Sequence, residues 1–85
     1  MASSNVMLTP RAESDLRTLS KEDRARVVKS LNRLAATDAE GALSFPIAKL
    51  ESTPEYYVLR ANRMRVVFRF IDGGILVAGI YQRRK

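Results

Sequence analysis

The sequence has 85 residues, enough for one domain, and a chain of this size buries roughly 60–65% of the surface that its unfolded form exposes. Its 46% hydrophobic and 28% charged content is typical of a folded globular protein. Cysteine and histidine are both absent, which excludes disulfides, thiolate metal sites and catalysis by either residue. Catalysis would therefore use arginine, lysine, tyrosine, hydroxyl or carboxylate groups, and we expect neither a metal nor a cofactor.

The first ten residues, MASSNVMLTP, lack a basic region followed by an apolar core, and the sequence contains no run of eighteen apolar residues. Neither secretion nor membrane insertion is indicated. The absence of cysteine is compatible with a reducing compartment, so we expect a cytoplasmic protein.

The excess positive charge lies in residues 56–85. This segment holds seven basic residues and one acid, a net charge of +6, whereas residues 1–55 hold eight of each and are neutral. The same segment is the best strand former in the chain. A localised cationic sheet favours a nucleic acid as partner, although anionic lipid or an acidic protein remains open.

The N-terminal half predicts a strand followed by two helices. Asn5–Leu8 is a short apolar run typical of an edge or second-row strand. Thr9 suits an N-cap and Pro10 the first helical position, so a first helix is predicted to run to about Leu19. Ser20 caps a second helix that begins at once. Its apolar positions repeat at three- and four-residue steps and are Val27, Val28, Leu31, Leu34 and Ala35.

Five basic residues occupy the other faces of this second helix. They either contact phosphate or form a solvated face balanced in part by Glu22 and Asp23, and the charge pattern favours the solvated face. The five are Lys21, Arg24, Arg26, Lys29 and Arg33.

The C-terminal half predicts a β-meander. Residues 37–55 lose periodicity and are punctuated by glycine and proline, which indicates a long connection that packs back onto the core. Three strands follow, at 56–60, 64–71 and 75–82, joined by tight turns. The predicted fold is one α+β domain over residues 1–85, in the order β-α-α-β-β-β, with an antiparallel meander packed against an N-terminal helical hairpin.

Arginines are predicted to line the open face of this meander. Alternation along the middle strand puts Arg65 and Arg69 opposite the apolar set that faces the helices. Arg60 and Arg83 reach the same face if the hairpin registers allow, because a slip of one residue reverses a side chain. The planar guanidinium matches phosphate oxygens in a bidentate way.

Tyrosines lie beside these cations, at Tyr56, Tyr57 and Tyr81. Aromatic platforms next to a cationic groove hold single-stranded RNA. The alternative for the tyrosines is packing within the sheet, and the alternative for Arg69 is an ion pair with Glu51, Glu55 or Asp72.

The order of strand, helical hairpin, AKL near the end of the connection and YYVLRANRMRVVFRFIDGGILVAGIYQRR resembles the RelE/ParE superfamily of toxins from bacterial type II toxin–antitoxin systems. The likeness covers nearly the whole chain and implies the RelE-like microbial RNase fold. Its most specific part is LRANRMRVVF at residues 59–68, which is similar to the family's R-V-G-x-Y-R-V-V-Y hairpin with Asn62 where glycine is usual.

Members of the RelE branch are endoribonucleases, or mRNA interferases, that cut mRNA in the ribosomal A site without a metal. The RNA 2′-hydroxyl is the nucleophile. By this resemblance Arg65 is the transition-state arginine and Arg83 the second arginine, while Arg60 and Lys49 match further basic positions. The residues also predicted to bind RNA are Arg63, Arg69, Arg84, Lys85 and Tyr57.

The sequence departs from the family pattern at two places. Val58 stands where a second basic residue is expected, and the sequence reaches Lys85 without the C-terminal tyrosine that these nucleases often use. Three interpretations stay open: Tyr81 takes the catalytic role of that tyrosine, the enzyme is slow, or the chain lies outside the nuclease branch.

The resemblance implies a cognate antitoxin, assembly into a toxin–antitoxin hetero-oligomer, and the ribosome and mRNA as targets. Two alternatives remain. The ParE branch shares the fold and poisons DNA gyrase without enzymatic activity, but generally lacks the basic catalytic set. A basic RNA-binding module without catalytic activity is compatible with the composition.

Overall fold

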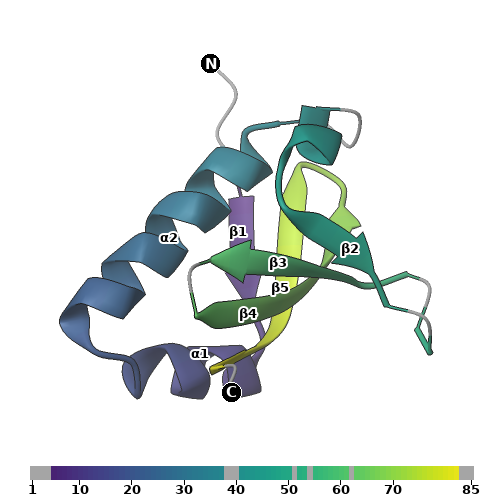
Figure 1. The fold of residues 1–85 in the computed structure, drawn as a ribbon. Helices are drawn as coiled ribbons and strands as arrows, with labels where there is room; N and C mark the ends of the chain where they lie inside the picture. Colours follow the sequence, from purple (N-terminus) through teal and green to yellow (C-terminus); the bar gives the residue numbers. More distant parts are fainter. Residues whose placement is uncertain (1–4, 38–40, 51, 54, 62, 83–85) are drawn as a thin grey trace.

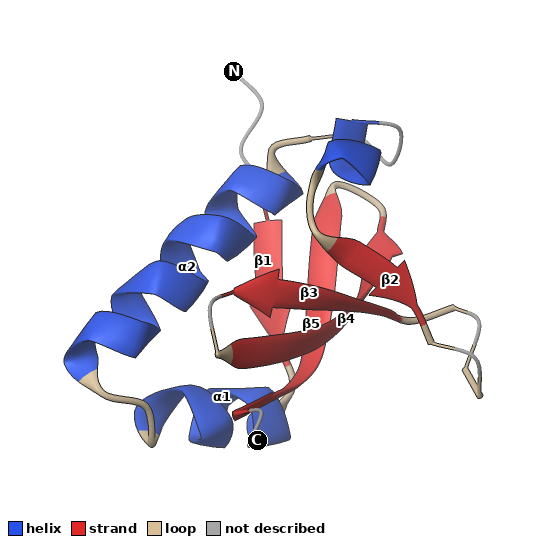
Figure 2. Cartoon of the chain, in the orientation of Figure 1, coloured by secondary structure: helices blue, strands red, loops and turns tan. Residues whose placement is uncertain are grey.

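The computed structural model describes residues 5–37, 41–50, 52–53, 55–61 and 63–82. These residues form a mixed five-stranded sheet, in the order β1-β5-β4-β3-β2, and two α-helices that lie against it (Figures 1 and 2). The elements in chain order are β1 (Asn5–Leu8), α1 (Pro10–Arg17), α2 (Lys21–Ala35), the 3-10 helix η1 (Gly41–Ser44), β2 (Ile47–Lys49), β3 (Tyr57–Ala61), β4 (Met64–Ile71) and β5 (Gly74–Gln82).

Both predicted helix caps are present. The Thr9 hydroxyl accepts a hydrogen bond from the backbone N–H of Ala12 at 3.1 Å, and the Ser20 hydroxyl accepts one from Asp23 at 3.1 Å. Each satisfies a backbone donor that has no partner within its helix. The first helix ends at Arg17, two residues before the predicted end.

Arg24 of α2 stabilises the short connection between the two helices. Its guanidinium donates to the backbone carbonyls of Leu16, Arg17 and Leu19, at 3.3–3.4 Å. These carbonyls lie at the C-terminal end of α1, where a cation also interacts favourably with the helix dipole. Arg24 is therefore a structural residue.

The core lies between the helices and one face of the sheet. Ala12 of α1 and one face of α2 meet the buried residues of β3, β4 and β5. On β4 the burial alternates, as predicted, with Met64, Val66 and Phe68 facing the helices. The buried apolar residues are Ala12, Val27, Leu31, Leu34, Leu59, Ala61, Met64, Val66, Phe68, Ile75, Val77 and Ile80.

Two parts of the predicted fold are wrong. The antiparallel meander of β3, β4 and β5 is confirmed, but the sheet as a whole is mixed, because β1 pairs in parallel with β5. No hairpin joins these two strands, so the turn geometry that sets the direction of the meander does not apply to β1. The predicted element order also omits β2, which lies inside the expected connection and pairs antiparallel with β3. Three residues are too few to show an alternating pattern.

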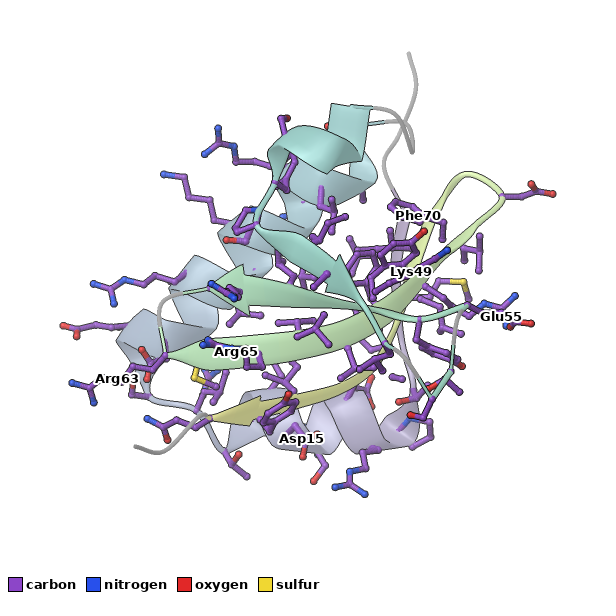
Figure 3. The ribbon with its side chains drawn as sticks, turned by 45° about the vertical axis from the view of Figure 1, so that its right-hand side comes forward. Asp15, Lys49, Glu55, Arg63, Arg65 and Phe70 are labelled. Carbon is purple, nitrogen blue, oxygen red and sulfur yellow. The ribbon has the colours of Figure 1, made fainter. Side chains whose placement is uncertain are left out.

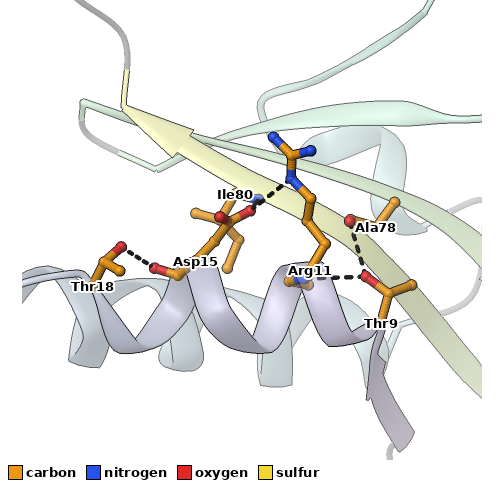
Figure 4. A network of polar contacts seen from close by, with 7 residues as sticks. Thr9, Arg11, Asp15, Thr18, Ala78 and Ile80 are labelled. Atoms are coloured by element: carbon orange, nitrogen blue, oxygen red, sulfur yellow. Dashed lines mark hydrogen bonds and ion pairs between the residues drawn. The ribbon is translucent and has the colours of Figure 1, made fainter.

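Helix α1 covers the edge of β5 that β1 does not reach. Strand β1 pairs with Gly74 to Val77. Beyond that point the Thr9 hydroxyl donates to the carbonyl of Ala78 at 3.0 Å, and the Asp15 carboxylate accepts from the backbone N–H of Ile80 at 3.0 Å (Figure 4). Asp15 is half-buried against the sheet. Two side chains therefore take the place of a neighbouring strand.

Neither α-helix in the described part of the chain is long and apolar enough to cross a membrane.

We predict that Asp15→Ala lowers the free energy of unfolding by about 1–3 kcal/mol, because the substitution leaves the half-buried N–H of Ile80 without its acceptor. Asp15→Asn retains an acceptor oxygen, so we expect a smaller loss. Glu13→Ala is the matched control, since its 3.8 Å ion pair with Arg17 is exposed and worth about 0–1 kcal/mol. Urea denaturation followed by circular dichroism measures the three variants. Equal losses for Asp15→Ala and Glu13→Ala would contradict the role of Asp15.

Candidate functional site

Three sequence-predicted residues form one row across the open face of the sheet. Arg60 of β3 lies directly opposite Arg65 of β4, and Arg65 lies directly opposite Tyr81 of β5. Directly opposed residues on paired strands share a face, and neighbouring strands lie about 4.7–4.9 Å apart. The backbone positions that carry the two guanidinium groups and the phenol therefore span roughly 10 Å across the sheet. We call Arg60, Arg65 and Tyr81 the cross-strand row.

A β-bulge in β5 determines which residue completes this row. From the turn at Gly73, where φ is 82°, the register pairs Phe68 with Val77, whereas further on Val67 pairs with Gly79. Ala78 is therefore the extra residue. Without it, continuous pairing would place Ile80 opposite Arg65 and turn Tyr81 toward the core. The bulge instead buries Ile80 and leaves Tyr81 about half exposed on the open face, at 51%.

Arg65 is the half-buried member of the row on the central strand. Its Nη1 donates to the carbonyl of Met64 at 3.1 Å, which restricts the position of the guanidinium. Arg60 and Tyr81 are exposed on the flanking strands (Figure 3 labels Arg65). A partly fixed central arginine with exposed neighbours can hold an anionic group above β4.

A hollow of about 240 Å³ lies at the β5 end of the row. Tyr81, Gly79 and Val67 contribute to its lining from the sheet, and Arg11 and Asp15 contribute from α1. The Arg11 side chain extends over β5 and pairs with Asp15 at 3.8 Å (Figure 4). Sequence analysis assigned Arg11 no function, because its place beside the open face depends on α1 lying along β5. It is a cation of the site that sequence analysis missed.

Lys49 and Tyr57 lie on the other face of the sheet from the cross-strand row. Lys49 is opposite Tyr57, and Tyr57 is opposite the buried Phe68. The Tyr57 ring stacks on Phe68 at a centroid distance of 5.8 Å and meets Phe70 edge-on at 5.4 Å, so it packs with the core side (Figure 3 labels Lys49 and Phe70). The structure does not bring these two residues together with Arg65, and their contact with RNA stays a prediction.

The remaining predicted residues are spread out. Arg69 shares the open face but lies four residues along β4, about 13 Å from Arg65, and pairs with Glu55 at 3.7 Å. Arg63 is exposed at the turn between β3 and β4 (Figure 3). Arg83, Arg84 and Lys85 lie outside the described residues.

Chemically, the cross-strand row suits an anion that accepts several hydrogen bonds. An arginine stays protonated and only donates, so Arg60 and Arg65 are able to bind an anion but not to act as bases. The Tyr81 hydroxyl both donates and accepts, and its ring offers a stacking surface. Within the described part of the chain, no group of three or more carboxylates is placed to hold a metal ion.

Comparisons with known proteins identify the fold. No family model matches the sequence, and no curated protein is similar to it in sequence. Several solved structures have similar folds. The isolated RelE toxin of Escherichia coli superposes with a TM-score of 0.73 at 22% identity, covering 96% of this chain and 86% of that one. The Staphylococcus aureus YoeB dimer gives 0.75 at 23%, covering 99% and 100%. The Mycobacterium tuberculosis RelBE2 toxin–antitoxin complex gives 0.73 at 20%, covering 100% and 97%. The chain therefore has the RelE fold.

We predict that Arg60→Gln stabilises the folded chain at low salt by about 0.2–1 kcal/mol, because it removes a like charge directly opposite Arg65. The gain should shrink as added salt screens the repulsion. Urea denaturation at two salt concentrations measures it. Arg69→Gln is the comparison, since it breaks an ion pair instead and should not stabilise. A loss of stability in Arg60→Gln at both salt concentrations would show that the arginine contributes to folding rather than opposing it.

Proposed function

We propose that this protein is the toxin of a type II toxin–antitoxin system and acts as a ribosome-dependent mRNA endoribonuclease. The observation that carries the proposal is the cross-strand row on the open face of a sheet with the RelE fold. By the family resemblance, Arg65 matches the transition-state arginine and Arg60 matches a further basic position. An active toxin would work in the cytoplasm, where ribosomes and mRNA are found.

In the proposed reaction the RNA 2′-oxygen attacks the adjacent phosphorus and the bond from phosphorus to the 5′-oxygen breaks. The products are a 2′,3′-cyclic phosphate and a 5′-hydroxyl, so the 2′-hydroxyl loses one proton and the leaving oxygen gains one. Charge accumulates on the non-bridging oxygens in the transition state. Donors already in position stabilise that charge more than water does.

The cross-strand row supplies a role for each member. Arg65, central and half-buried, donates to the non-bridging oxygens, and Arg60 binds the same phosphate or the next one. The Tyr81 hydroxyl is the described group of the row able to pass a proton, and its ring stacks on a base. Arg83 is assigned to the site on the family resemblance alone.

We propose a cognate antitoxin as the protein partner. Solved structures with this fold include toxin–antitoxin complexes from Escherichia coli and Mycobacterium tuberculosis. The cationic open face needs a partner of opposite charge, and an acidic segment that covered the row would exclude RNA from it. Such a pair would assemble as a toxin–antitoxin hetero-oligomer.

A gyrase poison related to ParE is the weaker candidate. Two arginines directly opposed on one face lower the stability of the fold. A poison that acts by protein contact does not require such a pair. A basic RNA-binding module without activity would tolerate such a row but does not require it. Mapping mRNA cut sites with and without ribosomes separates both alternatives from the proposed nuclease.

We predict that Arg65→Ala reduces mRNA cleavage by about 10²–10³-fold and relieves growth arrest, because one charge donor to the transition state is lost. Arg83→Ala should act in the same direction. Arg17→Ala is the matched control, since it removes one exposed positive charge from α1. Cleavage by purified protein on translating ribosomes gives the rate. Growth arrest by Arg65→Ala at equal protein level would disprove the catalytic assignment.

We further predict that induction of the unmodified chain alone stops protein synthesis in a bacterial host, and that co-expression of the antitoxin restores it. Radiolabelled amino-acid incorporation after induction is the measurement. Normal growth with abundant folded protein would reject the toxin proposal as a whole.

A further inference from the structure

The described residues also form a basic furrow between α2 and the end of the β3–β4 hairpin. Three hollows follow one another along α2, of about 320, 220 and 330 Å³. Arg26 lines the first two, and Ser30 and Arg33 line the last two, so the hollows are continuous. We call them together the α2 furrow.

The charged residues that line the α2 furrow are predominantly cationic. Its basic lining comprises Arg26, Lys29, Arg33, Arg60 and Arg63, and its acidic lining comprises Glu22 and Asp23, which lie at the first hollow. The positions 26, 29 and 33 fall on one side of the helix, because they are three and four residues apart. None of the three ion pairs found among the described residues involves a cation of α2. Arg26, Lys29 and Arg33 are exposed, in agreement with the solvated face that the sequence pattern favoured, and they line a concave surface.

Arg60 connects the α2 furrow to the cross-strand row. It lines the third hollow with Ser30 and Arg33, and it stands opposite Arg65 on the sheet. Because α2 lies on the core side of the sheet, a chain bound across the row would pass around β3 at Arg60 to reach the furrow.

We propose that the α2 furrow binds the sugar-phosphate backbone of the single-stranded RNA that occupies the cross-strand row. This inference rests on the proposed function. The rise of α2 from Arg26 to Arg33 is about 10 Å, and a stacked strand carries one phosphate per 3.4 Å, so this stretch covers roughly three phosphates. The serine hydroxyl of Ser30 lies between the cations and suits a backbone rich in acceptors.

An acidic protein segment fits the middle hollow of the furrow less well than RNA. A peptide that binds a groove uses apolar anchors as well as charge. In the middle hollow the apolar contribution comes from Ala61, which is only 8% exposed. The lining there is otherwise Arg26, Lys29, Ser30 and Arg33. The middle hollow therefore offers phosphate partners and little for an apolar side chain to fill, whereas the third hollow is also lined by Phe45, Pro46 and Leu59.

Salt-dependent binding of a 2′-O-methylated nine-nucleotide RNA tests the proposal, because this RNA has no 2′-hydroxyl and cannot be cleaved. The test variant is Arg26→Gln/Arg33→Gln, and the matched control is Arg17→Gln/Lys21→Gln. Each lowers the net charge from +6 to +4. Neither Arg17 nor Lys21 lines the furrow or the row. Circular dichroism confirms that both variants keep their helices.

We expect the slope of log affinity against log salt to fall by about 1.4 in the test variant, since each lost contact to a single strand contributes about 0.7. The factor by which affinity falls between 50 and 200 mM salt should then be roughly sevenfold smaller for the test variant than for the unmodified chain. The control variant should keep the original slope. A 2′-O-methylated trinucleotide, which spans only the row, should bind the test variant and the control equally.

Three results would overturn the proposal. The first is an equal salt slope for the test variant and the control. The second is that the unmodified chain does not bind the nine-nucleotide RNA at 50 mM salt. The third is that the test variant loses affinity for a poly-glutamate peptide but not for RNA. The third result would assign the furrow to an acidic protein. If the furrow proposal alone is wrong, Arg65→Ala still reduces mRNA cleavage. If the proposed nuclease function is wrong, Arg65→Ala has no cleavage to reduce, so the two failures are distinguishable.

Discussion

The contact of α1 with the free edge of β5 is the constraint on which the candidate site depends. Strand β1 is too short to pair with all of β5, so Thr9 and Asp15 bind the backbone where β1 stops. The bulge at Ala78 lies in this stretch. An unpaired, bulged edge would leave backbone groups unsatisfied and the register free to slip. By holding that edge, α1 keeps Ile80 in the core and Tyr81 on the face of Arg65.

The two faces of the sheet are under opposite physical demands. The helix side is an apolar core in which Phe68, Val66 and Ile75 are fully buried. The open side places Arg60 and Arg65 directly opposite each other, an arrangement that opposes folding. A small domain tolerates this repulsion because its stability comes from the core side.

Local patterns predicted most of the fold, and long-range pairing accounts for the failures. The caps at Thr9 and Ser20 and the alternation along β4 depend on a few neighbouring residues, and the structure confirms them. The parallel pairing of β1 and the role of Asp15 join residues about 65 or more positions apart, which no local pattern reports. For the site, alternation predicted the face of Arg65. The meeting of Arg60 with Arg65 and Tyr81 required the registers, including a bulge without a sequence signal.

The arrangement of charge bears on how an RNA substrate would be activated. Attack by a 2′-oxygen needs that oxygen, phosphorus and the leaving 5′-oxygen nearly in line, and a regularly stacked strand does not offer this geometry. The cross-strand row runs over the sheet, whereas the α2 furrow runs along a helix at the end of β3, and Arg60 belongs to both. A strand bound by both would change direction at Arg60, next to Arg65. Unstacking there would use binding energy from the furrow to bring the reacting atoms into line, beside Arg65, the arginine proposed to stabilise the charge they develop.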